Sequence, residues 1–336
     1  MKKRIIIGCL LIAQLLLTGC GNWNDSVVND INPDVTFQPV SNSFHYDQLN
    51  EEEVQVYEAI LALGKTFKGG VIELEKPISA NSWLRILHTV NYDYEKRFWP
   101  LVMIYILNED GTDFVELSDE KTISKLYVQL NDPIKNENIK TFRQEHSEEG
   151  LLLNEEAFVS LLQDSTLTEE YFLEKTKQIE AVEQEIIAGM PKDIGQKDAV
   201  TYFCNWLKDN MDYDIGLYKT YADLAADGTL VPNEYGNVSY RNCILQETAV
   251  CGGFATILTD LCNQVGIPAY VVTGTVITNG KAAQHGWVAL EIGGQTLYMD
   301  PTYAVSMNRV DYFCTREQLK ARSDGRRYVF SEVFEY

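Results

Sequence analysis

AVCGGFATILTDLCNQVGIPAY (Ala249–Tyr270) is the stretch that decides the fold of this chain. Its large apolar residues recur three and four positions apart, which is typical of a helix with one buried face. They are Phe254, Ile257, Leu258, Leu261 and Val265. Gly266 and Pro268 follow, as glycine and proline commonly do where a helix ends. The spacing therefore predicts a buried helix that begins near Cys251.

Cys251 falls in the first turn of this helix. A thiol there lies at the positive end of the helix dipole, which favours the thiolate and lowers the thiol pKa. Gly252 and Gly253 follow, and residues without a β-carbon let a substrate backbone approach the sulfur. A cysteine can also be a small apolar residue in a core, so a nucleophile needs a base and an orienting group elsewhere in the chain.

The chain after the helix is predicted to form antiparallel strands. They lie in AYVVTGTVI (269–277) and on both sides of Gly293-Gly294 in HGWVALEIGGQTLYMDPTY (285–303), with Asn279-Gly280 as the first turn. If Gly293-Gly294 is a two-residue turn, His285 and Asp300 become diagonal neighbours on one face of the sheet, with backbones roughly 7 to 8 Å apart. A three-residue loop would break this parity.

Four motifs in this order resemble the transglutaminase-like domain of the papain-like superfamily. They are VCGGFA (250–255), GIPAYVVTG (266–274), HGWVALEI (285–292) and YMDPTY (298–303), and the similarity runs from about Ala199 to Tyr303. The resemblance implies an α+β fold in which the cysteine-bearing helix packs on an antiparallel sheet. It also implies a triad: Cys251 as nucleophile, His285 as general acid and base, and Asp300 as the group that orients the histidine. Trp287 would pack beside the histidine.

A tetrahedral oxyanion on Cys251 would need hydrogen-bond donors around it. The backbone N–H of Cys251 is one candidate, and the second is the side chain of Gln246 or Tyr240, between which the sequence does not choose. Trp287 is grouped with these two as a candidate substrate contact.

Cys262 shares the buried face of the helix and is predicted to be structural, and Cys204 and Cys243 are predicted to be packing or disulfide residues rather than catalytic ones. Cys314 is the remaining cysteine that could pair, and the sequence does not fix which cysteines do. The chain has no Cys-x-x-Cys spacing and no histidine pair at i, i+4, so no metal and no cofactor are expected.

The first twenty residues, MKKRIIIGCLLIAQLLLTGC, indicate export. A basic start precedes an apolar run that is too short for a membrane span, as in a signal peptide. The end, Leu17-Thr18-Gly19-Cys20, resembles the lipobox of bacterial lipoproteins. It implies that Cys20 carries lipid chains, which hold the protein on the extracytoplasmic face of the cell membrane. An uncleaved N-terminal anchor is the alternative.

The composition suits folded domains: the chain has 336 residues, 45% of them hydrophobic. Its formal net charge of −21 argues against nucleic acid and against a flat anionic membrane surface as partners. We expect four regions in the chain: a lipoprotein signal peptide (1–19), a flexible tether (20–45), a smaller N-terminal α+β domain (46–165) and the transglutaminase-like domain (166–336).

Several elements can be placed within these regions. A helix is predicted from the Asn50 and Glu53 capping pair, with Val54, Tyr57 and Leu61 on its buried face. Further helices are predicted in 82–90, 168–191 and 197–214, strands in 99–107 and 125–130, a turn at 108–112 and an ordered loop near the site at 214–242. The three histidines outside the candidate triad are interpreted as structural: His88 as a core residue, His45 and His146 as exposed ones.

These features predict a thiol enzyme that performs acyl transfer on amide or peptide substrates, among them cell-wall peptide. Hydrolysis is favoured over cross-linking because water is abundant outside the cell. The alternative is a non-catalytic surface module that uses the same fold to bind a peptide or a glycan-linked peptide.

Overall fold

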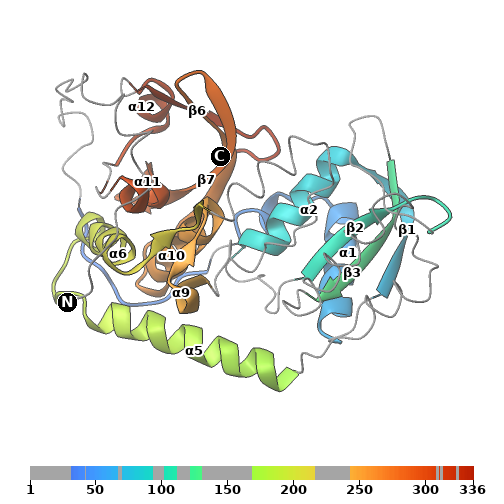
Figure 1. Cartoon of the computed structure of the whole chain (residues 1–336), viewed down its shortest axis with the longest axis horizontal. Coiled ribbons are helices and arrows are strands. Elements are labelled where there is room, and N and C mark those ends of the chain that lie inside the picture. The colour runs from blue at the N-terminus through green and yellow to red at the C-terminus, as the bar shows by residue number, and fades with distance from the viewer. Residues whose placement is uncertain are drawn as a thin grey trace.

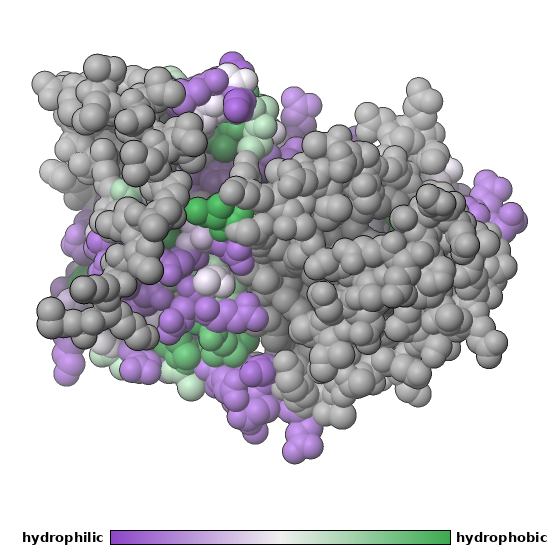
Figure 2. All heavy atoms as spheres, in the orientation of Figure 1, coloured by the Kyte–Doolittle hydropathy of each residue, from purple (hydrophilic) through white to green (hydrophobic). Residues whose placement is uncertain are grey.

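The computed structural model of the chain has the expected α+β fold, with its elements in two groups (Figure 1). The structure describes residues 32–41, 43–66, 70–93, 102–111, 122–130, 169–215, 243–307, 310, 313–322 and 325–336. Among these residues, no helix is long and apolar enough to cross a membrane. Hydrophilic side chains of the described residues reach the outer edges of the face in Figure 2, as expected from the net charge of −21.

The first group is a three-stranded antiparallel sheet packed against two helices. Its elements are α1 (Glu51–Gly64), β1 (Gly70–Ser79), α2 (Ala80–Tyr92), β2 (Val102–Leu107) and β3 (Thr122–Leu130), in the strand order β1-β3-β2. The predicted capping box of Asn50 and Glu53 begins α1. Its buried face is centred on Tyr57 and Ile60, both 0% exposed, so Val54 lies at the margin of that face and not within it. No strand is predicted from the sequence at the position of β1.

The second group is built on a four-stranded antiparallel sheet in the order β8-β7-β6-β9. Its helices are α5 (Glu169–Ala188), α6 (Gln196–Asn210), α9 (Cys243–Gln246), α10 (Cys251–Gln264), α11 (Pro301–Ser306) and α12 (Arg316–Lys320). Its strands are β4 (Asp212–Tyr213), β5 (Thr248–Ala249), β6 (Ala269–Thr278), β7 (Lys281–Ile292), β8 (Gln295–Met299) and β9 (Arg326–Phe330). The helix α10 packs on β6 and β7, which is the predicted arrangement of a cysteine-bearing helix on an antiparallel sheet.

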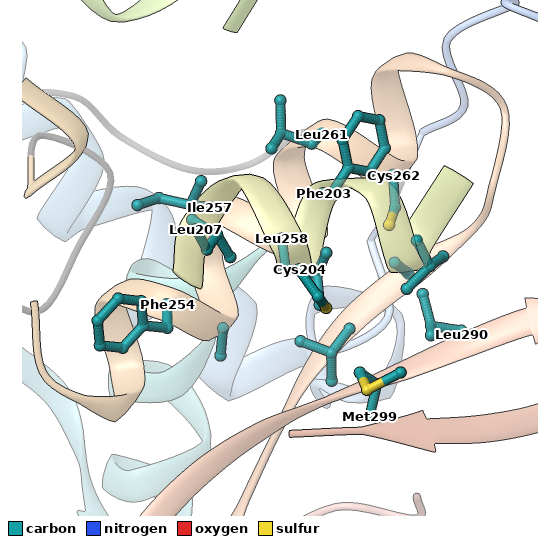
Figure 3. Packing of buried hydrophobic residues seen from close by; sticks show 14 of the residues in the cluster. Phe203, Cys204, Leu207, Phe254, Ile257, Leu258, Leu261, Cys262, Leu290 and Met299 are labelled. Atoms are coloured by element: carbon teal, nitrogen blue, oxygen red, sulfur yellow. The ribbon is translucent and has the colours of Figure 1, made fainter. Parts of the chain in front are cut away.

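The main hydrophobic core lies where α6 and α10 meet the sheet (Figure 3). Phe203 and Leu207 of α6 and Leu258 of α10 are 0% exposed, as their helical spacing predicts. Burial of each such side chain stabilises the fold by about 1.5–3 kcal/mol. The core therefore fixes α10, and with it the start of the helix at Cys251, against the sheet.

The segment before α1 differs from the expected tether. The N–H of Val35 donates to the carbonyl of Ile194 at 3.0 Å, and the N–H of Val40 donates to the carbonyl of Asn263 at 2.8 Å. These are main-chain hydrogen bonds, which need no apolar period in the sequence and so leave no signal in it. The part of the tether described here, from residue 32 onward, is thus attached to the second group.

His45 is buried, and the expectation that it is exposed is wrong. Its Nδ1 lies 2.8 Å from Oδ1 of Asp93, and its Nε2 lies 3.0 Å from the carbonyl oxygen of Val271. Both ring nitrogens of His45 therefore have a buried oxygen within hydrogen-bond distance. His45 and Asp93 are both 0% exposed. Because Asp93 follows α2 and Val271 lies in β6, the two hydrogen bonds of the His45 ring join the two groups of elements.

His88 of α2 is half-buried, with its Nδ1 3.4 Å from the hydroxyl of Thr273. Burial lowers its pKa to about 3, and the charge of His45 adds to the effect. His88 is therefore a neutral packing residue at physiological pH, close to the interpretation made from the sequence. His146 lies outside the described residues.

Candidate active site

Cys251 is the first residue of α10, as predicted. The first N–H groups of a helix have no partner within it, so the thiol lies at the positive end of the helix dipole. Asn263, in the last turn, holds the helix on the sheet: its side chain accepts from the N–H of Ala269 at 3.0 Å and donates to the carbonyl of the same residue at 2.9 Å. Gly266, at φ 84°, follows the helix.

Two tight turns set the register of the sheet that faces Cys251. Left-handed backbone is found at both residues of each turn: Asn279 (φ 51°), Gly280 (φ 77°), Gly293 (φ 60°) and Gly294 (φ 75°). Such pairs are typical of two-residue hairpins. Ile292 consequently pairs with Gln295, which confirms the predicted register.

The structure brings the three predicted triad residues together. Nε2 of His285 lies 2.9 Å from Oδ2 of Asp300, and the thiol of Cys251 is hydrogen-bonded to the imidazole of His285. Because Nε2 is engaged with the carboxylate, Nδ1 is the nitrogen that faces the thiol. The backbone N–H of Gly286 also donates to the sulfur. This linked arrangement is what a nucleophile, its base and an orienting group require.

The protonation states of the three residues are coupled. Burial opposes ionisation of Cys251, but the hydrogen bond and the charge of His285 outweigh it, and the pKa of the thiol is lowered. Burial also opposes the charged form of His285, yet Asp300 and Cys251 raise its pKa to about 10. Burial alone would raise the pKa of Asp300, but the charge and hydrogen bond of His285 hold it well below its usual range. The site therefore favours a thiolate beside an imidazolium more than an isolated cysteine and histidine would.

Asp300 has further partners that the sequence analysis missed. As the N-cap of α11, its Oδ1 accepts from the N–H of Tyr303 at 3.3 Å. The hydroxyl of Tyr328 donates to Oδ2 at 2.6 Å, and Nη1 of Arg326 donates to that hydroxyl at 3.2 Å. Both residues belong to β9, whose alternating buried and exposed positions are the local signal of a strand. That signal does not say which tyrosine reaches the carboxylate, because β9 pairs with a distant strand.

The candidate oxyanion and substrate residues are placed differently. Trp287 packs beside His285 as predicted, with ring centroids 6.1 Å apart, but it is 0% exposed and so offers no surface to a substrate. Gln246 is exposed at the end of α9. Tyr240 lies outside the described residues, as does most of the loop predicted at 214–242.

The remaining cysteines in the described part of the chain are buried, in keeping with packing roles. They are Cys204, Cys243, Cys262 and Cys314. Burial raises the pKa values of Cys243 and Cys262 above the ordinary thiol value. Within the described residues, no group of three or more His, Cys, Asp and Glu side chains is placed to hold a metal ion.

The model of the transglutaminase-like superfamily matches residues 180–301. The chain contains a transglutaminase-like domain. The match to this domain includes Cys251, His285 and Asp300 and ends before β9. The matched residues therefore include the three linked side chains, and the chain beyond the match supplies Tyr328.

The solved structures that resemble the chain include two with 17% sequence identity to it. The first, "Crystal structure of a TGase", has a TM-score of 0.34 and covers 62% of this chain and 49% of that one. The second, a "Putative Cysteine Protease from Cytophaga hutchinsonii", has a TM-score of 0.29 and covers 63% of this chain and 65% of that one. The chain thus spans about half the length of the first (49%). No curated protein matches the chain.

The family match and the linked Cys251, His285 and Asp300 together support a cysteine-dependent enzyme of the transglutaminase-like fold.

Proposed function

We propose that this chain is a thiol enzyme that performs acyl transfer on amide or peptide substrates. One observation carries the proposal: the Cys251 thiol, the His285 imidazole and the Asp300 carboxylate form one continuous hydrogen-bonded chain. A non-catalytic binding module on this fold would need no such alignment, and the direction of the pKa changes favours an ionised nucleophile.

The reaction follows from these groups. The Cys251 thiolate attacks the amide carbon, a C–S bond forms, and the carbonyl oxygen takes the negative charge. The imidazolium of His285 gives its proton to the leaving amine as the C–N bond breaks, which leaves a thioester and a neutral imidazole. Water or an amine then attacks the thioester, His285 takes the proton of the attacking group, and the C–S bond breaks to release the acyl product and restore the Cys251 thiolate beside the imidazolium.

Water is the acceptor that we propose, so the reaction is a hydrolysis. The proposed location is the extracytoplasmic face of the cell membrane, with a lipid on Cys20, where water greatly outnumbers amine nucleophiles. The proposed substrates are peptides or proteins, including cell-wall peptide. The first oxyanion donor would be the backbone N–H of Cys251, with Gln246 as a candidate for the second.

A substrate screen with matched variants tests the reaction. The parent protein, Cys251→Ala, His285→Ala and the control Cys243→Ala are each incubated with peptide libraries and cell-wall peptides, and the products are identified by mass spectrometry. We expect the parent and the control to add water across an amide bond and the two site variants to be inactive. Loss of ammonia with joined peptides would identify cross-linking instead. Retained peptide binding with no turnover by any of the proteins would favour the binding module.

The lipid anchor is tested separately, on protein isolated from membranes. Mass spectrometry of the mature N terminus should find Cys20 modified by lipid. An unmodified Met1 would overturn this part of the proposal and leave the chemistry of Cys251 untouched.

A further inference from the structure

Tyr328 lies against the proposed catalytic group without belonging to the family match. Its hydroxyl and Nε2 of His285 donate to the same oxygen, Oδ2 of Asp300, at 2.6 Å and 2.9 Å. Tyr328 is on β9, beyond residues 180–301. We propose that Tyr328 is a positioning residue, which fixes the carboxylate of Asp300 so that Asp300 in turn holds His285 toward Cys251. This inference rests on the proposed function.

The ring of Tyr328 is itself held in place. It is 1% exposed and packs edge-on against Trp287, with the two ring centroids 5.1 Å apart. Its centroid lies 6.2 Å from that of the His285 ring. A side chain enclosed in this way keeps one orientation, so the hydroxyl of Tyr328 has a fixed position in the site. The same burial prevents any contact with a substrate, so Tyr328 can act on the reaction through Asp300.

Arg326 sets the direction of the hydrogen bond. It donates to the hydroxyl oxygen of Tyr328 at 3.2 Å, and its guanidinium lies over the ring of Tyr303, 3.4 Å from the centroid. Because the hydroxyl oxygen accepts from this cation, its proton points to Asp300, and the bond to the carboxylate is strengthened. Burial, followed by the charge of Asp300, raises the pKa of Tyr328 well above its usual value, so the hydroxyl keeps its proton.

The three donors leave the carboxylate one orientation. Oδ1 is held by the N–H of Tyr303, and Oδ2 is held from two sides by Tyr328 and His285. Without the Tyr328 hydroxyl, Oδ2 keeps a single donor and the carboxylate can turn about its bond to the β-carbon. His285 would then lose a fixed partner, and the thiolate of Cys251 would be less well stabilised.

The hydroxyl of Tyr328 also draws negative charge away from the carboxylate of Asp300. This weakens the hydrogen bond from His285 to Asp300, whereas positioning of the carboxylate strengthens it. If charge withdrawal were its whole role, removal would strengthen the bond from Asp300 to His285 and lower the pKa of Cys251. A positioning role predicts the reverse. The direction of the change in the pH dependence of Cys251 therefore separates the two roles, and a tyrosine that merely fills space would cause no change.

The experiment measures the rate of Cys251 alkylation by iodoacetamide against pH, with mass spectrometry to follow this thiol. The proteins are the parent, Tyr328→Phe and the control Tyr270→Phe, which removes another buried hydroxyl from the same cluster of residues without touching Asp300. In Tyr328→Phe we expect the acid limb of the profile to move to higher pH by about one pH unit, because a hydrogen bond to a charged group is lost. The control should match the parent.

Two kinds of result would overturn the inference. An acid limb that stays in place or moves to lower pH in Tyr328→Phe, with a normal parent profile, removes the positioning role and leaves the proposed function intact. If Cys251 of the parent protein ionises like an ordinary thiol, both the positioning role of Tyr328 and the proposed function are overturned. If Tyr328→Phe does not fold, as judged by its thermal unfolding, Arg326→Gln is measured instead; it withdraws the cation behind the hydroxyl and should shift the limb in the same direction.

Discussion

Cys251 and Cys262 lie on the same helix but differ in their position along it, in their burial and in the groups beside their thiols. Cys251 is at the positive end of α10, half-buried, and beside an imidazole that lowers its pKa. Cys262 is at the other end of α10, fully buried, and burial together with nearby Cys204 raises its pKa. Position in the helix was readable from the sequence through its apolar spacing. The difference in ionisation was not, because it comes from a strand that follows later in the chain.

The pH dependence of turnover should reflect the ionisation of both Cys251 and His285. Cys251 must be ionised and its pKa is lowered, so activity should rise on the acid side at a pH below the ordinary thiol value. His285 must be protonated and its pKa is raised to about 10, so activity should fall on the alkaline side near that pH. A plot of kcat/KM against pH checks the prediction, and a single rise near the ordinary thiol pKa would contradict it.

The charge of Asp300 should matter more than its shape. Asp300→Asn keeps the volume but removes the charge that, with its hydrogen bond, raises the pKa of His285. We expect the imidazole to lose its proton at lower pH and turnover to fall about 10²- to 10⁴-fold, in line with the same change in other triads. Steady-state kinetics at neutral pH test this, and thermal unfolding shows whether the fold is retained. Activity within a few-fold of the parent would mean that Asp300 does not orient the base.

Strand parity explains why so much of the site could be predicted. The two glycines of the Gly293-Gly294 turn allow a two-residue hairpin, and this alone puts His285 and Asp300 on the same face of the sheet. Strand parity of this kind predicts the register of two strands that are joined by a short turn. The pairing of β9 with β6 joins residues that are far apart in the chain, from 48 positions (Thr278 and Arg326) to 56 positions (Gly274 and Phe330), and no local pattern specifies it. Tyr328 was missed for that reason, as were the main-chain bonds of residues 33–40.

Gly274 should be required for the close packing of β6 in the four-stranded sheet. It pairs with His285 on one side and Phe330 on the other. A β-carbon there would overlap the carbonyl oxygen of Val329 and come within 2.8 Å of the Trp287 ring. Gly274→Ala should therefore lower the free energy of unfolding by about 1–3 kcal/mol, because the core is overpacked.

Urea unfolding measures the effect of Gly274→Ala. Gly286→Ala on the neighbouring strand is the control for stability, because its added β-carbon would meet its nearest atoms at an ordinary 3.8 Å. Equal stability of the two variants would show that the close approach of β9 to β6 is not tight enough to require glycine.

At the scale of the whole molecule, the two groups of elements are joined by the buried pair of His45 and Asp93. Removal of the His45 side chain takes away both of its hydrogen bonds and leaves the buried carboxylate of Asp93 to the backbone N–H groups of residues 45 and 46. His45→Ala should therefore lower the free energy of unfolding by about 3–5 kcal/mol. Lys76→Ala is the matched control, since it breaks a pair with Glu52 whose side chains are 74% and 54% exposed and should cost at most about 1 kcal/mol.

A double-variant cycle completes this test. Unfolding of His45→Ala, Asp93→Ala and the double variant is followed in urea, and the double variant should lose clearly less than the sum of the two single variants. Simple additivity would show that the two residues stabilise the protein independently and that their interaction is not what joins the groups.

The cysteines have a consequence for how the protein can be produced. The structure places no disulfide between any two of the five cysteines in its described part, and four of them are buried. Native folding of this part then needs neither an oxidant nor a disulfide isomerase, even if the chain is exported to an oxidising compartment. Expression without the leader in a reducing cytoplasm should yield the same folded protein. Its thermal midpoint should be unchanged by a reductant such as dithiothreitol, and a clear fall in that midpoint would indicate a stabilising disulfide.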